Sequence, residues 1–183
     1  MITLTTPLTK DKIKELHAGD EVLLSGTIYT GRDAAHKRLV QLLDEGKDLP
    51  FDVLDQTIFY VGPTPSKPGK VFGSGGPTTS GRMDAYSPTM IKLGLRAMIG
   101  KGYRSSEVKQ AIVDNTGVYF GAIGGAGAMM NSCIEECEII AFEDLGPEAI
   151  RKLKVKDMPL VVVIDSDGND LYEIGRKEYL RRK

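Results

Sequence analysis

Apolar residues follow two patterns along this chain, and each pattern predicts one type of element. Short, nearly continuous apolar runs rich in β-branched residues predict strands at 21–30, 57–62, 95–100, 118–123, 137–142 and 160–164. Helical spacing and helix-capping residues predict helices at 9–17, 32–46, 105–117, 129–135, 146–153 and 177–183. Segment 81–94 predicts one helix, or two short ones separated at Pro88, because proline is tolerated only in a first turn.

Strands that alternate with helices predict an α/β fold with a largely parallel sheet. In segment 159–175, Asp167 and Gly168 lie between two apolar runs, which predicts a C-terminal hairpin that adds an antiparallel piece. We find no internal repeat and no linker in the sequence. We therefore expect residues 1–183 to form a single domain.

Composition narrows the classes of function. The 183 residues include 24 basic and 25 acidic side chains, a net charge of −1, so we expect no nucleic-acid partner. The apolar runs are far shorter than the roughly 20 residues of a membrane span, and residues 1–12 lack a secretion signal's apolar core. We expect a cytoplasmic protein without a membrane partner. The two cysteines, Cys133 and Cys137, are too few to hold an iron–sulfur cluster or a structural zinc ion alone.

Candidate chemistry is concentrated in segment 75–86, GGPTTSGRMDAY, which follows a long loop rich in proline, glycine and serine. A loop of that length in a compact domain is more often functional or disordered than a plain connection. Its Arg82 lies at the start of a predicted helix, where free N–H groups favour an anion. Arg32 and Lys101 each follow a predicted strand directly.

In α/β folds the carboxyl ends of the strands form the ligand-binding edge, so these three cations are expected to converge on one pocket. Two arginines can hold two carboxylates in fixed orientation, and Thr78 and Thr79 would add hydroxyl groups. The pattern predicts a site for a small dianion. The alternative is that each arginine is a surface residue, Arg32 paired with Asp33 or Asp84.

Two other motifs are weaker. In segment 121–130, Gly125 and Gly127 resemble a dinucleotide-binding turn, but Met130 occupies the position where close helix packing needs a small residue. This turn is therefore either structural, part of another pocket, or a nucleotide site. Segment 165–170, DSDGND, lacks the glycine and glutamate that a calcium loop needs at its sixth and twelfth positions.

Four motifs, GTIYTGRDAAHKRL, GGPTTSGRMDAY, GKGYRS and YFGAIGGAGA, appear in this order. Together they resemble the C-terminal region, or β subunit, of class I, iron–sulfur-dependent fumarate hydratases. The β subunits of tartrate dehydratases are similar in outline. The contexts of Gly31 and Gly81 are more similar to fumarase.

The resemblance implies a swivelling three-layer β/β/α domain and a hydro-lyase that interconverts (S)-malate and fumarate. It implies a 4Fe–4S cluster on a partner, the fumarase α subunit, where the cluster would act as a Lewis acid on the departing hydroxide. It also implies that Arg32, Arg82 and Lys101 bind the carboxylates of the substrate, and that Thr78 is the catalytic hydroxyl. From the residue pattern, Thr78 and Thr79 are expected to bind the substrate as well. Supporting residues would be Asp33, His36, Gly81 and Asp84.

Three alternatives stay open at the level of sequence. The substrate could be tartrate, the chain could be a non-catalytic module that binds an anion or nucleotide through segment 121–130, and His36 could be a packing residue. A chain that needs a partner should expose an apolar patch, so a homo-oligomer is a further alternative.

Overall fold

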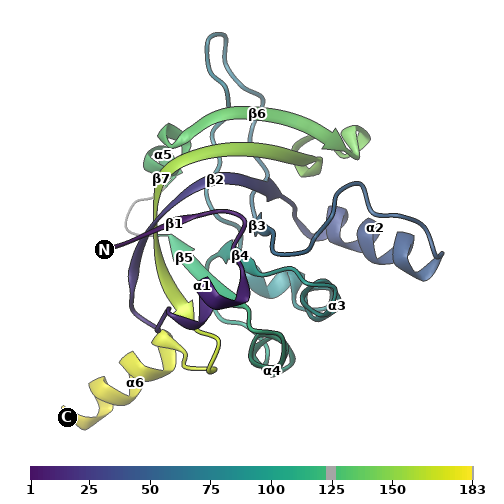
Figure 1. Cartoon of the computed structure of the whole chain (residues 1–183). Coiled ribbons are helices and arrows are strands. Elements are labelled where there is room, and N and C mark those ends of the chain that lie inside the picture. Colours follow the sequence, from purple (N-terminus) through teal and green to yellow (C-terminus); the bar gives the residue numbers. More distant parts are fainter. Residues whose placement is uncertain (123–126, 183) are drawn as a thin grey trace.

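The computed structural model describes residues 1–122 and 127–182 and shows an α/β fold built on one mixed sheet (Figure 1). Its strands are β1 (Ile2–Thr5), β2 (Glu21–Thr30), β3 (Thr57–Phe59), β4 (Ala97–Gly100), β5 (Val118–Ala122), β6 (Ile134–Ala141) and β7 (Ile150–Ile164). Its α-helices are α1 (Lys10–Lys14), α2 (Asp33–Asp44), α3 (Ser87–Lys92), α4 (Ser106–Asn115), α5 (Gly127–Ser132) and α6 (Leu171–Arg181). Two 3₁₀ helices, η1 (Ser80–Met83) and η2 (Glu143–Glu148), complete the elements.

The sheet has the order β1-β2-β3-β4-β5-β7-β6 and is mixed. Neighbours from β1 to β5 pair in parallel, whereas β7 pairs antiparallel with β5, β6 and β2. Because β7 contacts both β5 and β2, the strands β2, β3, β4, β5 and β7 form a closed, barrel-like ring. The α/β class is confirmed, but the largely parallel sheet is wrong.

Strand β7 overturns two expectations from the sequence. The helix expected at 146–153 is instead the end of η2 followed by the first residues of β7, which pair with β6 and β2. The hairpin expected at 159–175 is reduced to one antiparallel bridge between Ile164 and Asp170, since α6 begins at Leu171. The Asp165 carboxylate accepts hydrogen bonds from the backbone of Ala18, Asp167 and Asn169, and the Asp170 side chain caps α6 at Tyr172 N, 2.9 Å away. These bonds turn the chain into a helix.

Other elements agree closely with the sequence patterns. The strand expected at 21–30 matches β2, and Ser105 caps α4 by accepting a hydrogen bond from Val108 N. Segment 81–94 contains the end of η1 and then α3, in which Pro88 occupies the first turn. Within the described ranges, no helix combines the length and apolar character needed to cross a membrane.

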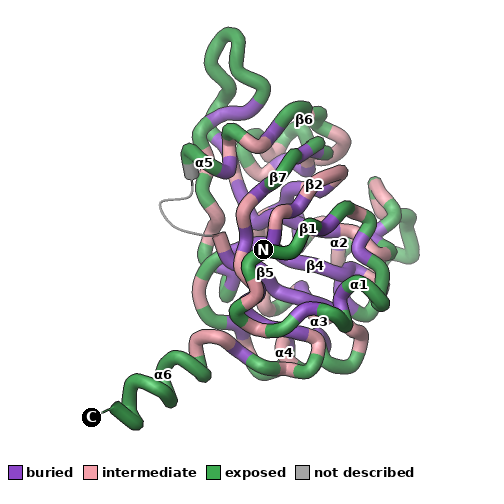
Figure 2. Tube along the Cα trace, turned by 60° about the vertical axis from the view of Figure 1, so that its left-hand side comes forward, coloured by how far each residue is buried: buried purple, intermediate pink, exposed green. Residues whose placement is uncertain are grey.

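The alternation of side chains along β3, β4 and β5 divides the core into two clusters. Phe59, Ile99 and Phe120 belong to the cluster that also contains the apolar residues of α1, β2 and much of β7, inside the ring. Their neighbours Tyr60 and Tyr119 belong to the cluster formed with α2, α3 and α4. These helices lie on one side of the strands (Figure 1), and Figure 2 shows the buried residues concentrated along the strands. Both faces of the parallel strands are therefore covered.

Candidate active site

Backbone hydrogen bonds bring the predicted site segments to one edge of the parallel strands. Thr78 N donates to Tyr60 O at 2.7 Å, just beyond β3, and Tyr60 N donates to Ile99 O of β4. Thr79 forms a parallel bridge with Lys101, the residue after β4. Gly31 N donates to Phe59 O, so the end of β2 that precedes Arg32 lies beside the same strands. The carboxyl ends of β2, β3 and β4 thus meet, as in other α/β ligand sites.

Arg32 and Arg82 lie on either side of Asp33. Arg82 Nη2 donates to Asp33 Oδ2 at 2.8 Å, and Arg32 Nε lies 3.8 Å from Asp33 Oδ1 and 3.7 Å from Glu148 Oε1. Burial raises the pKa of Asp33, but hydrogen bonds from its own backbone and from Arg82, together with the charge of Arg82, lower it below the ordinary value. Asp33 therefore lies beside both arginines, and its supporting role in a binding site stays a prediction.

Arg32 packs tightly and is not fully satisfied. Its side chain lies against Gly62, where an added Cβ would be 2.8 Å from Arg32 Cδ. Its Nε is buried without a hydrogen-bond partner, and so is Asp33 Oδ1. Buried polar atoms without partners are uncommon and need an explanation. A bound anion could accept a hydrogen bond from Arg32 Nε, whereas Asp33 Oδ1 is an acceptor and would need a donor such as a hydroxyl group.

The hydroxyl groups and the third cation are accessible. Thr78 is half-buried, whereas Thr79, Arg82 and Lys101 are exposed. Lys101 lines a pocket of about 400 Å³ together with Gly76, Pro77, Gly100 and Tyr172. Arg32, Arg82 and Thr78 are not among the residues that line it. The backbone therefore brings the segments together, while this pocket contains only Lys101 of the three predicted cations.

His36 is a buried residue whose ring contacts the backbone of Arg32. Its ring is fully buried, and both its backbone N and its Nδ1 lie within hydrogen-bond distance of Arg32 O, at 2.9 and 2.8 Å. Because a carbonyl only accepts, Nδ1 carries the proton in the neutral ring. Burial lowers the pKa of His36 to about 4. Its position is that of a neutral residue that orients the backbone at Arg32.

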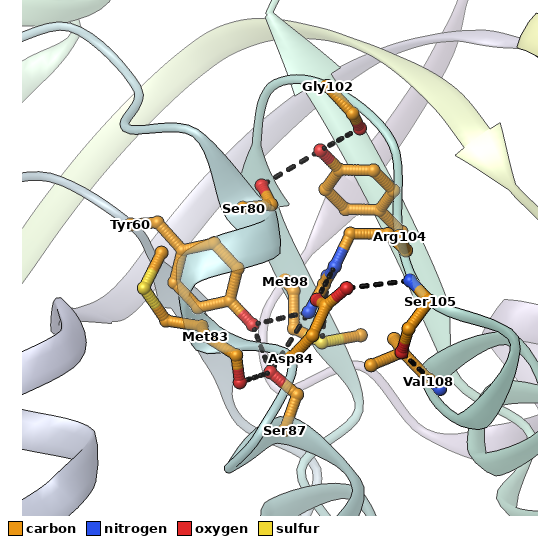
Figure 3. Close-up of polar contacts among 11 residues, drawn as sticks. Tyr60, Ser80, Met83, Asp84, Ser87, Met98, Gly102, Arg104, Ser105 and Val108 are labelled. Carbon is orange, nitrogen blue, oxygen red and sulfur yellow. Dashed lines mark hydrogen bonds and ion pairs between the residues drawn. The ribbon is translucent and has the colours of Figure 1, made fainter.

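Asp84 pairs with Arg104, a residue that the sequence analysis did not select. Its Oδ1 accepts a hydrogen bond from Arg104 Nε at 2.7 Å, and its Oδ2 accepts one from Ser105 N at 2.6 Å (Figure 3). These two oxygens therefore do not form the alternative Arg32–Asp84 pair. Arg104 lies inside the motif GKGYRS, from which sequence reasoning selected only Lys101. An arginine placed three residues after a strand-end lysine was the available signal.

The described residues do not fit a metal cluster on this chain. Among them, no group of three histidine, cysteine, aspartate or glutamate side chains could hold a metal ion. Cys133 and Cys137 are free, and burial raises the pKa of both thiols, which disfavours the thiolate form that binds metal. The nucleotide-site alternative depends on residues 123–126, which lie outside the described residues.

Comparison with known proteins identifies the family of this chain. The family model described as Fumarase C-terminus matches residues 1–175. A candidate class I fumarate hydratase of Geobacillus stearothermophilus is 41% identical over 187 aligned positions, covering 100% of this chain and 35% of that protein. The anaerobic class I fumarate hydratase of Escherichia coli is 42% identical, covering 82% of this chain and 28% of that protein.

A shorter relative matches from end to end. A candidate L(+)-tartrate dehydratase subunit beta of Methanocaldococcus jannaschii is 38% identical over 179 residues, which are 94% of this chain and 92% of that protein. The chain thus spans about a third of the fumarate hydratases that it matches, but nearly the whole of this subunit. The match of the family model over residues 1–175 and these identities show that the chain belongs to the Fumarase C-terminus family.

Proposed function

We propose that this chain is the β subunit of a hydro-lyase that interconverts (S)-malate and fumarate. The observation that carries the proposal is the arrangement of Arg32, Asp33 and Arg82 beside the Thr79–Lys101 bridge, at the ends of three neighbouring strands. Class I fumarate hydratases of 41% and 42% identity support the reaction assigned. The tartrate dehydratase subunit supports a separate β chain.

In this proposal the cations bind and orient the two carboxylates of the substrate. Arginine meets a carboxylate with two parallel hydrogen bonds, and Arg82 is accessible because its side chain is 54% exposed. Removal of the proton at C3 pushes negative charge into the neighbouring carboxylate. Fixed guanidinium and ammonium groups stabilise that charge as it develops, so binding residues also contribute to the rate.

Thr78 and Thr79 are assigned to the same site. Thr78 is held by its backbone bond to Tyr60 O, and it is the hydroxyl proposed to act at C3. A threonine hydroxyl is a weak base, so this role requires a base from elsewhere. Gly81 leaves space beside the turn, since an added Cβ there would meet only Tyr103 O, at 3.8 Å.

The remaining parts of the site are proposed to come from a partner. The 4Fe–4S cluster does not fit the described residues of this chain, so we assign it to a fumarase α subunit. The proposed complex has this chain as a single domain that swivels over the partner's site.

The experiment joins this chain to the N-terminal region of the Geobacillus class I fumarate hydratase and measures fumarate hydration without oxygen. Arg82→Lys should lower kcat/KM by about 100-fold without unfolding the chain, because lysine cannot form the bidentate contact. The matched control is Arg38→Lys, since Arg38 forms a bidentate pair with Asp144 on the surface. Full activity of Arg82→Lys would contradict the assigned binding role.

A second candidate, L(+)-tartrate as substrate, is favoured by the 92% coverage of the tartrate dehydratase subunit. The same joined enzyme distinguishes the two. Faster turnover of tartrate than of malate would support this candidate and overturn the malate assignment.

A further inference from the structure

Arg104 is the most completely enclosed arginine near the candidate site. Its side chain is 0% exposed, and three of its nitrogens are engaged: Nε by Asp84, Nη1 by Met98 Sδ at 3.5 Å, and Nη2 by Ser87 Oγ at 2.9 Å. Its guanidinium also lies over the rings of Tyr119 and Tyr60, 4.8 and 5.3 Å from their centroids. Figure 3 shows these groups converging on the guanidinium.

Stability alone does not account for such a residue. Removing two charges from water costs several kcal/mol, and well-packed apolar residues often replace a buried ion pair without loss of stability. Buried ionic groups can instead select one arrangement of the segments that they join. The segments joined by Arg104 therefore indicate its role.

The hydrogen bonds around Arg104 hold both ends of η1, the turn that contains Gly81 and Arg82. At the far end, Asp84 binds Arg104, and Ser87 Oγ donates to Met83 O at 3.0 Å. At the near end, Ser80 Oγ lies 2.8 Å from Tyr119 OH, which donates to Gly102 O.

The same bonds hold the segment of Lys101. Gly102 follows Lys101 directly, Arg104 lies three residues after it, and Ser80 N donates to Lys101 O at 2.9 Å. One buried network thus joins the two segments that carry Arg82 and Lys101. Neither of these cations is itself part of the buried network.

We propose that Arg104 is a positioning residue, which holds η1 and the segment after β4 in register so that Arg82 and Lys101 face one dicarboxylate. Arg104 does not touch the substrate in this proposal. The role in catalysis rests on the proposed function, whereas the role in placing Arg82 beside Asp33 can be tested without it.

The test uses the full chain and the titration of Asp33 by carbon-13 NMR. Asp33 faces Arg32, Arg82, Glu148 and His36, and Arg82 supplies both a hydrogen bond and a charge that lower its pKa. Arg104→Met should raise the pKa of Asp33 by at least half of the rise caused by Arg82→Gln. In the joined enzyme, Arg104→Met should lower kcat by about 10- to 100-fold, the cost of a small misplacement.

Arg96→Met is the matched control. Arg96 is 3% exposed and donates to Asp55 and to two backbone carbonyls, but it precedes β4, at the end opposite Lys101. Its loss should destabilise the chain and leave the pKa of Asp33 unchanged. If Arg104→Met fails to fold, Tyr119→Phe is used instead. It removes only the hydroxyl that joins Ser80 to Gly102, and it should raise the pKa of Asp33 by a smaller amount.

Two outcomes separate the proposals. A folded Arg104→Met chain with the pKa of Asp33 unchanged would overturn the positioning role. A joined wild-type enzyme without fumarate hydratase activity, accompanied by the expected shift of Asp33, would overturn the proposed function and leave the positioning role supported.

Discussion

His36 shows how one residue makes stability depend on pH. Burial lowers its pKa from 6.5 to about 4 in the folded chain. Below pH 6.5 the unfolded chain takes up a proton at His36, but the folded chain does not until about pH 4. The unfolded state then binds more protons, so the free energy of unfolding falls as the pH falls through this window.

We expect His36→Asn to abolish this pH-dependent fall in the free energy of unfolding, which amounts to about 3 kcal/mol between pH 6.5 and pH 4. Asparagine keeps an N–H donor toward Arg32 O but does not titrate. Urea unfolding at a series of pH values measures the effect. His17→Asn, at the other and exposed histidine, is the comparison variant. Equal slopes for wild type and His36→Asn would contradict the assignment.

At the scale of elements, β4 and η1 are in contact through a glycine. A Cβ added at Gly100 would lie 1.9 Å from Ser80 Oγ and 2.9 Å from Tyr60 Cδ2. No side chain fits there unless η1 moves. Gly100 therefore sets the distance between the strand that leads to Lys101 and the turn that carries Arg82.

Gly100→Ala should destabilise the fold by about 1–3 kcal/mol, the usual cost of overpacking a core. Urea unfolding measures it. Gly175→Ala is the control, because Gly175 lies in α6 with no atom within 4 Å of an added Cβ. Combining Gly100→Ala with Ser80→Ala removes the closest clashing atom and should recover part of the loss. No recovery would show that Ser80 is not the obstacle.

At the scale of the whole molecule, stability should be unevenly distributed. Residues of β7 pair with β2 on one side and with β5 or β6 on the other, and Met158, Leu160 and Val162 are buried. Helix α6 contains no buried residue and extends away from the strands (Figures 1 and 2). Opening β7 breaks the ring, whereas opening α6 exposes little apolar surface.

We expect the amides of β7 to exchange hydrogen only through global unfolding and those of α6 through local opening. The dependence of exchange on denaturant distinguishes the two, since only global unfolding exposes a large surface. Helix α4 is the control because it has one buried face, with Val108 and Ile112, and should exchange more slowly than α6. If the amides of α6 were as well protected from exchange as those of β7, the expected uneven distribution of stability would be contradicted.

The sequence by itself determined the elements whose apolar period is uninterrupted. Strand β2 and helices α2 and α4 follow from local spacing and caps, because burial of one face requires that spacing. It also placed Arg32 and Lys101 after strands, which fixes them at one edge once those strands are parallel. Whether these residues bind substrate stays a prediction.

Only the tertiary structure decided the direction of β7, the turn into α6 and the burial of Arg104. The pairings of β7 with β2 join residues more than a hundred positions apart, so no local pattern contains them. An arginine has the same sequence signature whether it is solvated or buried against Asp84 and Tyr60. Its environment is created by segments that meet only when the ring closes.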